Sequence, residues 1–155
     1  TSDTPLMYRT LAILGLISVV LAAAAARPAR AQNPGQVRVY MTGFDSDDGK
    51  ALVALFIMED GFPDEGRRAL LRREAVIRNG TAEVLFTDVP AGPYAVSVLH
   101  DLNGDYEMDT DLLGMPSEGY GVSRDGTRTF GAPRFRDCVL QLGAGESATI
   151  RIRIH

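Results

Sequence analysis

The stretch Glu74–Phe86, EAVIRNGTAEVLF, places Asn79-Gly80 between two short segments of strand-like composition. Asn-Gly is the pair that a two-residue β-hairpin turn favours, because both central residues of that turn need a positive φ. β-Branched and other apolar side chains on either side are typical of strands. This stretch therefore predicts two antiparallel strands, over 74–77 and 81–86, joined by a tight turn.

Outward from this hairpin, the chain continues as short strand-like segments separated by turn residues. In Gln36–Thr42 apolar and polar residues alternate, which is the pattern of a half-buried strand. Ser147–Ile154 alternates in the same way, and its isoleucines Ile150, Ile152 and Ile154 are expected to face a core. The remaining predicted strands are Ala51–Met58, Tyr94–Leu99 and Asp137–Leu142.

Seven strands with short connections predict an all-β fold, an antiparallel seven-stranded β-sandwich in a single domain over residues 36–155. The turn 44–50 is expected to join the first two strands as a hairpin, and 143–146 the last two. Residues 67–73 carry arginines around two leucines, which favours two turns of helix with a solvated basic face.

Residues 1–31 are expected to form a signal peptide. Leu11–Ala26 is a sixteen-residue apolar run after a short basic start at Met7, the expected initiator, with 1–6 an upstream mis-start. Ala29-Arg30-Ala31 supplies small residues where a signal peptidase reads, which predicts cleavage before Gln32. The alternative is a membrane anchor, although the run is shorter than the roughly 20 residues that span a bilayer. The expected location is the periplasm or the exterior, with no transmembrane anchor after cleavage.

Net charge and cysteine content limit the functions open to the cleaved chain. Removing the charges before Gln32 leaves 13 basic and 19 acidic side chains, a net charge of −6. Such a chain is a poor nucleic-acid binder, because phosphate contacts need clustered Lys and Arg. The single cysteine, Cys138, allows no intramolecular disulfide, and its apolar neighbours predict a small buried side chain rather than a nucleophile.

A series of motifs in the second half of the chain resembles one bacterial family. In order they are VPAGPYAV at 89–96, HDLNGD at 100–105, LGMP at 113–116, EGYGVS at 118–123 and FGAPRF at 130–135. Together they resemble the exported family known as domain of unknown function 2141, over roughly Val37–Ile154. The resemblance implies an Ig-like or transthyretin-like (prealbumin-like) sandwich with a signal peptide and no established activity. The Tyr-Arg-Gly-Ser ending of the transthyretin-like hydroxyisourate hydrolases is absent, since the chain ends in Arg-Ile-Arg-Ile-His.

The long segment His100–Gly131 carries the candidate site, because five carboxylates fall within the eleven residues 101–111. Their spacing partly matches an EF-hand loop, in which oxygen ligands at positions 1, 3, 5 and 9 and a backbone carbonyl at 7 converge on calcium. Tyr106 stands where that loop has its sharp-turn glycine, and Leu112 where it has its bidentate glutamate. The predicted ligands are Asp101, Asn103, Asp105, Glu107, Asp109 and Asp111.

Two interpretations of the acidic segment stay open from the sequence. In one, calcium relieves the repulsion between neighbouring carboxylates. In the other, the Asp and Asn side chains cap backbone amides and the charges are simply solvated.

The expected function is that of a non-catalytic binding or envelope-associated structural protein. A protein or glycan partner is expected, no enzyme activity, and no cofactor besides calcium. The rival interpretation is a small periplasmic hydrolase, with His100 as the general base and Ser123 as its nucleophile. The segment 118–123 is expected to form a binding lip, or an ordered loop packed over the end of the sandwich, where such folds carry recognition loops.

Overall fold

The computed structural model describes residues 33–126 and 131–155. The expected signal peptide and its cleavage site lie outside the described residues, as does part of the segment that follows Gly126. Within the described part the chain is all-β, as predicted, with eight strands in two sheets. No helix among these residues is long and apolar enough to cross a membrane.

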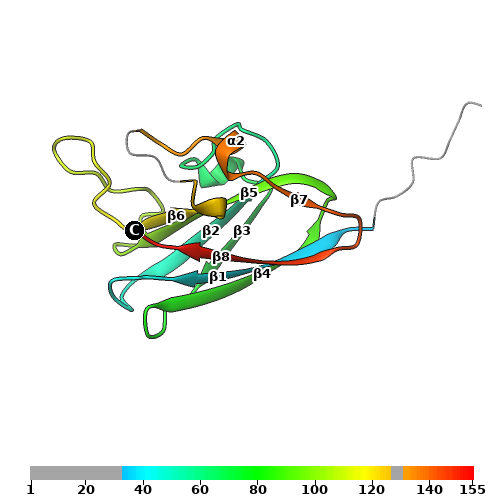
Figure 1. Ribbon diagram of the computed structural model, residues 1–155. Coiled ribbons are helices and arrows are strands. Elements are labelled where there is room, and N and C mark those ends of the chain that lie inside the picture. Colours follow the sequence, from blue (N-terminus) through cyan, green and yellow to red (C-terminus); the bar gives the residue numbers. More distant parts are fainter. Residues whose placement is uncertain (1–32, 127–130) are drawn as a thin grey trace, which may run out of the picture. The chain divides into compact units, whose positions relative to one another are not determined.

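The smaller sheet has three strands in the order β4-β1-β8 (Figure 1). They are β1 (Gly35–Thr42), β4 (Thr81–Val89) and β8 (Ser147–Arg153). β1 runs antiparallel to β4 but parallel to β8, with a continuous register from Gln36↔Ser147 to Thr42↔Arg153. The expectation of a wholly antiparallel fold is therefore wrong at this pair of strands.

The larger sheet has the order β3-β2-β5-β6, and β7 pairs with the start of β5. All its pairings are antiparallel. β6 is the strand that the sequence did not predict, and it lies inside the segment expected to be one long loop. The strands are β2 (Lys50–Phe56), β3 (Leu71–Ala75), β5 (Gly92–Asp101), β6 (Tyr120–Val122) and β7 (Leu140–Leu142).

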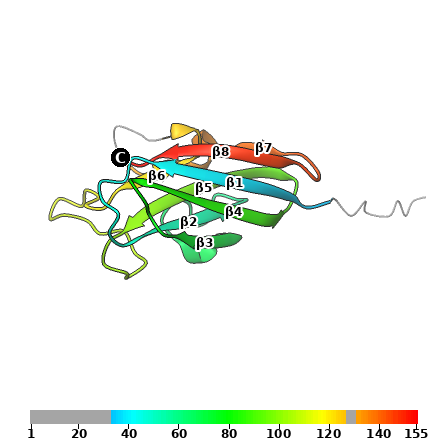
Figure 2. The ribbon, with the colours of Figure 1, turned by 90° about the horizontal axis from the view of Figure 1, so that it is seen from below.

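Both sheets contribute to one hydrophobic core, which explains why their strands alternate in composition. Val37, Val39 and Met41 of β1 are buried, as predicted, while their neighbours are exposed or half-buried. The same cluster includes Leu55 of β2 and Val96 of β5 from the other sheet. Viewed from below, the two sheets lie as layers one over the other (Figure 2).

Several tight turns join one sheet to the other rather than closing hairpins. At Asn79-Gly80 the backbone amides and carbonyls of Arg78 and Thr81 bond to each other, but β3 and β4 then enter different sheets. The predicted hairpins across 44–50 and 143–146 are also wrong, because β1 and β8 belong to the smaller sheet and β2 and β7 to the larger. The turn residues were identified correctly, and the partners of the strands were not.

Two predicted segments differ from the structure in the type of element or in where it begins. The helix expected over 67–73 is a 3-10 turn at Gly66–Arg68, and β3 begins at Leu71, three residues before the predicted strand. β3 is an edge strand whose arginines face solvent, so an apolar pattern could not reveal it. The strand expected from Asp137 starts as the short helix α2 (Phe135–Cys138) before β7. A second 3-10 turn, Ser123–Asp125, follows β6.

Candidate functional site

The acidic loop, residues 101–118, runs from the last residue of β5 to just before β6 and projects beyond the sheets (Figure 1). The loop is built from side chains that cap backbone amides. Asp101 Oδ1 accepts from the Gly104 N–H at 2.7 Å, and Asn103 Oδ1 accepts from the Asp105 N–H at 3.0 Å. Asp105 Oδ1 accepts from the Glu107 N–H at 2.8 Å. Acceptors at alternate positions thus curl the backbone tightly around their own side chains.

Tyr106 takes the backbone conformation that an EF-hand loop reserves for glycine. Its φ is 67°, in the left-handed region that side chains other than Asn, Asp and His seldom adopt. Lys50 Nζ, on β2, donates to the Tyr106 hydroxyl at 2.7 Å and lies 4.1 Å from the ring centroid. Although Tyr106 replaces the glycine of an EF-hand loop, the backbone therefore takes the same left-handed turn at this position.

Two predicted ligands, Asp105 and Asp109, converge on the side chain of a third. Asn103 Nδ2 donates to Oδ2 of Asp105 and to Oδ2 of Asp109, both at 3.0 Å. The amino group of an amide carries only a partial positive charge, yet it lies between two carboxylates. This is the point of the loop where a full positive charge would gain most.

Asp101 is the buried member of the loop. Its side chain is fully buried, and within the described residues its Oδ2 is the one buried side-chain oxygen or nitrogen that lacks a hydrogen-bond partner. Its Oδ1 is bonded to the Gly104 N–H, which ties the carboxylate to the loop. An unsatisfied buried polar atom costs about 1–3 kcal/mol, and more when it is charged.

Glu118 joins the acidic loop from its far end. The side chain is 6% exposed, and its Oε1 accepts from the Leu102 N–H at 2.8 Å. Its Oε2 accepts from the Asp109 N–H at 3.3 Å. The sequence predicted Glu118 in a lip or packed loop and not among the ligands. The signal that could have indicated its role is that Glu118 is the first glutamate after Leu112.

The carboxylates of Glu107 and Asp111 make contacts outside this cluster, although the predicted ligand atom of Glu107 is its backbone carbonyl oxygen. The Glu107 carboxylate lies 3.7 Å from Arg67, and both side chains are exposed. Asp111 Oδ1 accepts from the amides of Leu113 and Met115, at 2.8 and 2.9 Å, and so closes a separate turn. As the side chains stand, no three His, Cys, Asp or Glu residues in the described ranges gather closely enough to hold a metal ion.

His100 and Ser123 are not brought together. His100 Nε2 lies 2.9 Å from the Asp48 carbonyl oxygen, and its ring packs edge-on against Phe44. The Ser123 hydroxyl accepts from the N–H of Val96, which lies on β5 four residues before His100. Four residues along a strand span about 13 Å. The arrangement therefore lacks the contact that a base and a nucleophile require.

The lip expected over 118–123 is ordered as part of the larger sheet. Ser123 is fully buried, and its hydroxyl donates to the Cys138 carbonyl at 2.7 Å. Cys138 is buried as predicted, and burial raises the pKa of its thiol to about 11. The thiol is therefore neutral near pH 7 and a poor nucleophile.

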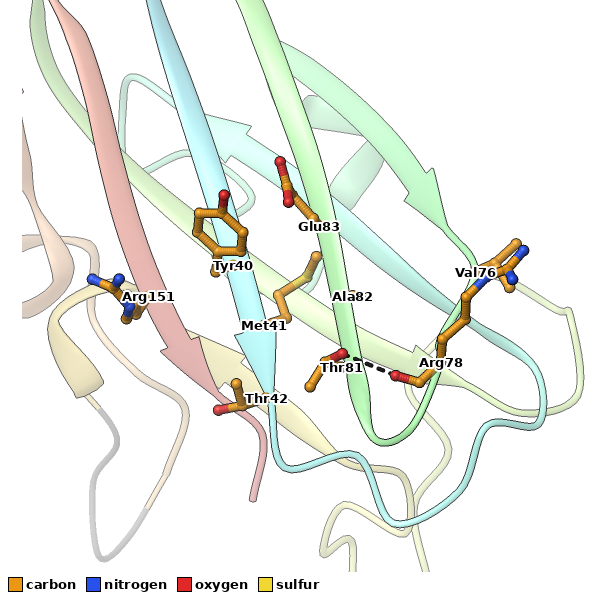
Figure 3. A pocket seen from close by; sticks show the side chains of 9 residues that line it. All are labelled: Tyr40, Met41, Thr42, Val76, Arg78, Thr81, Ala82, Glu83 and Arg151. Atoms are coloured by element: carbon orange, nitrogen blue, oxygen red, sulfur yellow. Dashed lines mark hydrogen bonds between the residues drawn. The ribbon is translucent and has the colours of Figure 1, made fainter.

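A second concave surface lies on the outer side of the smaller sheet (Figure 3). It is an open groove of about 540 Å³. Its one carboxylate, on Glu83, pairs with Arg38, so the groove offers no free acid for catalysis. The Arg151 guanidinium carbon lies over the Tyr40 ring, 6.0 Å from the ring centroid. The lining residues are Tyr40, Met41, Thr42, Val76, Arg78, Thr81, Ala82, Glu83 and Arg151.

The fold and the loop define an all-β protein of two sheets with an acidic loop between β5 and β6. The chain belongs to the family described as "Uncharacterized protein conserved in bacteria (DUF2141)", whose model matches residues 39–151. This confirms the family resemblance of the sequence motifs. No curated protein and no solved structure matches the chain.

Proposed function

We propose that this protein is an exported, non-catalytic β-sandwich of the Ig-like or transthyretin-like kind that binds calcium in its acidic loop. It serves as a binding or envelope-associated structural module in the periplasm or outside the cell. The observation that carries the proposal is the fully buried Asp101 carboxylate, whose Oδ1 bonds within the loop and whose Oδ2 has no partner. The apolar run Leu11–Ala26 supports export.

The charges around Asp101 support a cation in this place. Asp101 and Glu118 are both buried, and the loop between them carries four more carboxylates. In the part of the chain that the structure describes, Arg67 is the only basic residue that forms an ion pair with any of these six groups, and it pairs with Glu107 at the surface. Buried carboxylates without a cation are unfavourable, because each has lost its hydration.

Calcium fits this loop better than magnesium. Calcium takes about 6 to 8 oxygen ligands in a flexible arrangement, whereas magnesium demands near-ideal octahedral geometry and keeps its waters. The ion would displace the Asn103 amino group from between Asp105 and Asp109. The freed carboxylates of Asp105 and Asp109 would then bind the ion together with Asp101. Because the carboxylates come together only when the ion binds, the described loop without calcium need not hold them in a cluster.

Calcium is expected to stabilise the protein against heat. With a Kd of about 10⁻⁴ to 10⁻³ M, about 10 mM calcium adds roughly 1.4 to 2.7 kcal/mol of stability. This corresponds to a rise of several degrees in Tm for a domain of this size. The measurement is thermal unfolding of the purified protein in EDTA, in calcium and in magnesium.

Asp101→Ala and Asp105→Ala should each abolish the calcium-dependent rise. The matched control is Asp88→Asn, which removes one exposed carboxylate at the end of β4, four residues before β5 begins, and should keep the full rise. Asn tolerates the positive φ of 60° at this position. Equal Tm values in EDTA and calcium for the wild type would refute the proposal.

A further inference from the structure

Glu118 lies nine residues beyond Asp109 and outside the ligand pattern of the sequence, yet the chain returns to the acidic loop at this point. The Ser117 amide donates to the Asp109 carbonyl at 2.9 Å, which sets the start of the returning segment beside Asp109. The His100 amide donates to the Gly119 carbonyl at 2.8 Å, which fixes its end against β5. Glu118 is held between these two backbone bonds.

The Glu118 carboxylate spans the loop from one predicted ligand to another. Oε1 bonds to the amide that follows Asp101, and Oε2 bonds to the amide of Asp109 itself. Of the acidic side chains in the described residues, Glu118 is the one that joins the two ends of the ligand run in this way. Leu112, which occupies the glutamate position of an EF-hand loop, is fully exposed and cannot contribute.

Capping two amides leaves the negative charge of Glu118 uncompensated. Each carboxylate oxygen has a second lone pair, so Glu118 can hold the Leu102 and Asp109 amides and still face a cation. Glu118 and Asp101 are both buried, and neither forms an ion pair within the described ranges. A carboxylate is favoured at position 118 if its negative charge binds a cation.

We infer that Glu118 is the ligand that closes the calcium site, in the role that the bidentate glutamate plays in an EF-hand loop. This inference rests on the proposed calcium site and assigns to it a ligand from outside the acidic run 101–111. Asp111, in contrast, is not assigned to the site, because it is exposed and its bonds to the Leu113 and Met115 amides close a separate turn.

Closure by Glu118 connects the ion to the edge of the larger sheet. Gly119 leads directly into β6, and a Cβ at this position would lie 2.8 Å from Ile154 Cγ2. The Tyr120 and His155 backbones exchange hydrogen bonds of 3.2 and 3.0 Å. Calcium bound through Glu118 therefore restrains the loop, β6 and the C-terminal residues together.

The test compares Glu118→Gln with the matched control Asp111→Asn, each of which replaces one carboxylate by an amide of nearly the same shape. Calcium affinity is measured by isothermal titration calorimetry, and thermal unfolding is measured in EDTA. Glu118→Gln is expected to weaken calcium binding about tenfold or more, since affinity follows the charge and number of ligands. In EDTA its Tm should fall, because glutamine has one carbonyl oxygen for the two amides that Glu118 caps, and this loss is read separately from the calcium affinity. Asp111→Asn should bind calcium as the wild type does.

The outcomes separate this inference from the proposal on which it rests. If the wild type does not bind calcium, the calcium site itself is refuted. If the wild type binds and Glu118→Gln binds equally well, the site stands and the role of Glu118 is refuted. A Glu118→Gln protein that is less stable in EDTA but keeps its calcium affinity would show that Glu118 is only a cap, which also overturns the inference.

Discussion

The Ser123 hydroxyl connects three elements in the interior of the protein. It accepts from the Val96 N–H of β5 at 3.0 Å and donates to the Cys138 carbonyl of α2, while its own backbone follows β6. One lone pair of the oxygen and the hydroxyl proton are therefore engaged in structural bonds. A serine that looked like a candidate nucleophile in the sequence is a structural residue in the fold.

Ser123→Ala is expected to destabilise the protein by about 1–3 kcal/mol, because it leaves the Val96 amide and the Cys138 carbonyl without their partner. Denaturant unfolding measures the loss. Ser147→Ala, at an exposed position on β8, is the control and should change stability little. Equal midpoints for the Ser123 and Ser147 variants would contradict this structural role.

At the scale of single residues, the sequence predicted which side chains share one loop but not which groups they bond. Asp101, Asn103, Asp105 and Asp109 do share one loop, because their spacing forces successive capping turns. Glu118 escaped prediction because its approach depends on where β6 pairs with β5, which is a long-range event. Cys138 was predicted correctly, since a small apolar side chain in an apolar segment has little alternative to burial.

Among the elements, the turn at Asn79-Gly80 depends on a side chain from another loop. The Asp47 carboxylate accepts from the Asn79 and Gly80 amides, both at 2.8 Å. The bond from Gly80 has the largest effect and that from Asn79 the next, and both lower the pKa of Asp47 below its usual value of 3.8. The turn between the sheets is thus fastened to the connection between β1 and β2.

Asp47→Ala is expected to lower the Tm at neutral pH, and the difference from wild type should depend on pH. Because the pKa of Asp47 is lower in the folded state, its contribution is present above the unfolded-state pKa. It is lost as the pH falls through the folded-state pKa, below 3.8. Thermal unfolding between neutral and strongly acid pH measures this difference. Asp45→Ala, two residues away and exposed, is the control, and a pH-independent difference for Asp47→Ala would contradict the assignment.

Element types were more predictable than element partners. Alternation in β1 and β8 follows from burial of one face, so both strands were found from composition alone. The turn residues were found for the same local reason. Pairing was not predictable, because a turn such as Asn79-Gly80 fits equally well between two strands of one sheet and between strands of two sheets.

At the scale of the whole molecule, the parallel pairing of β1 with β8 has a mechanical consequence. The two strands are in register over seven residue pairs, from Gln36↔Ser147 to Thr42↔Arg153. β1 therefore starts at one end of the smaller sheet, and β8 finishes at the other. Tension applied before β1 and after β8 pulls the strands along their length in opposite directions, which loads all their hydrogen bonds together in shear.

Single-molecule pulling between residues 33 and 155 is accordingly expected to need a higher rupture force than pulling between residues 45 and 155. In the second geometry both handles lie at the same end of the strand pair, so the bonds of the ladder open one after another. Equal forces in the two geometries would contradict this expectation. A fold held in this way resists being drawn out by its two ends, although the same ladder is easily peeled from one side.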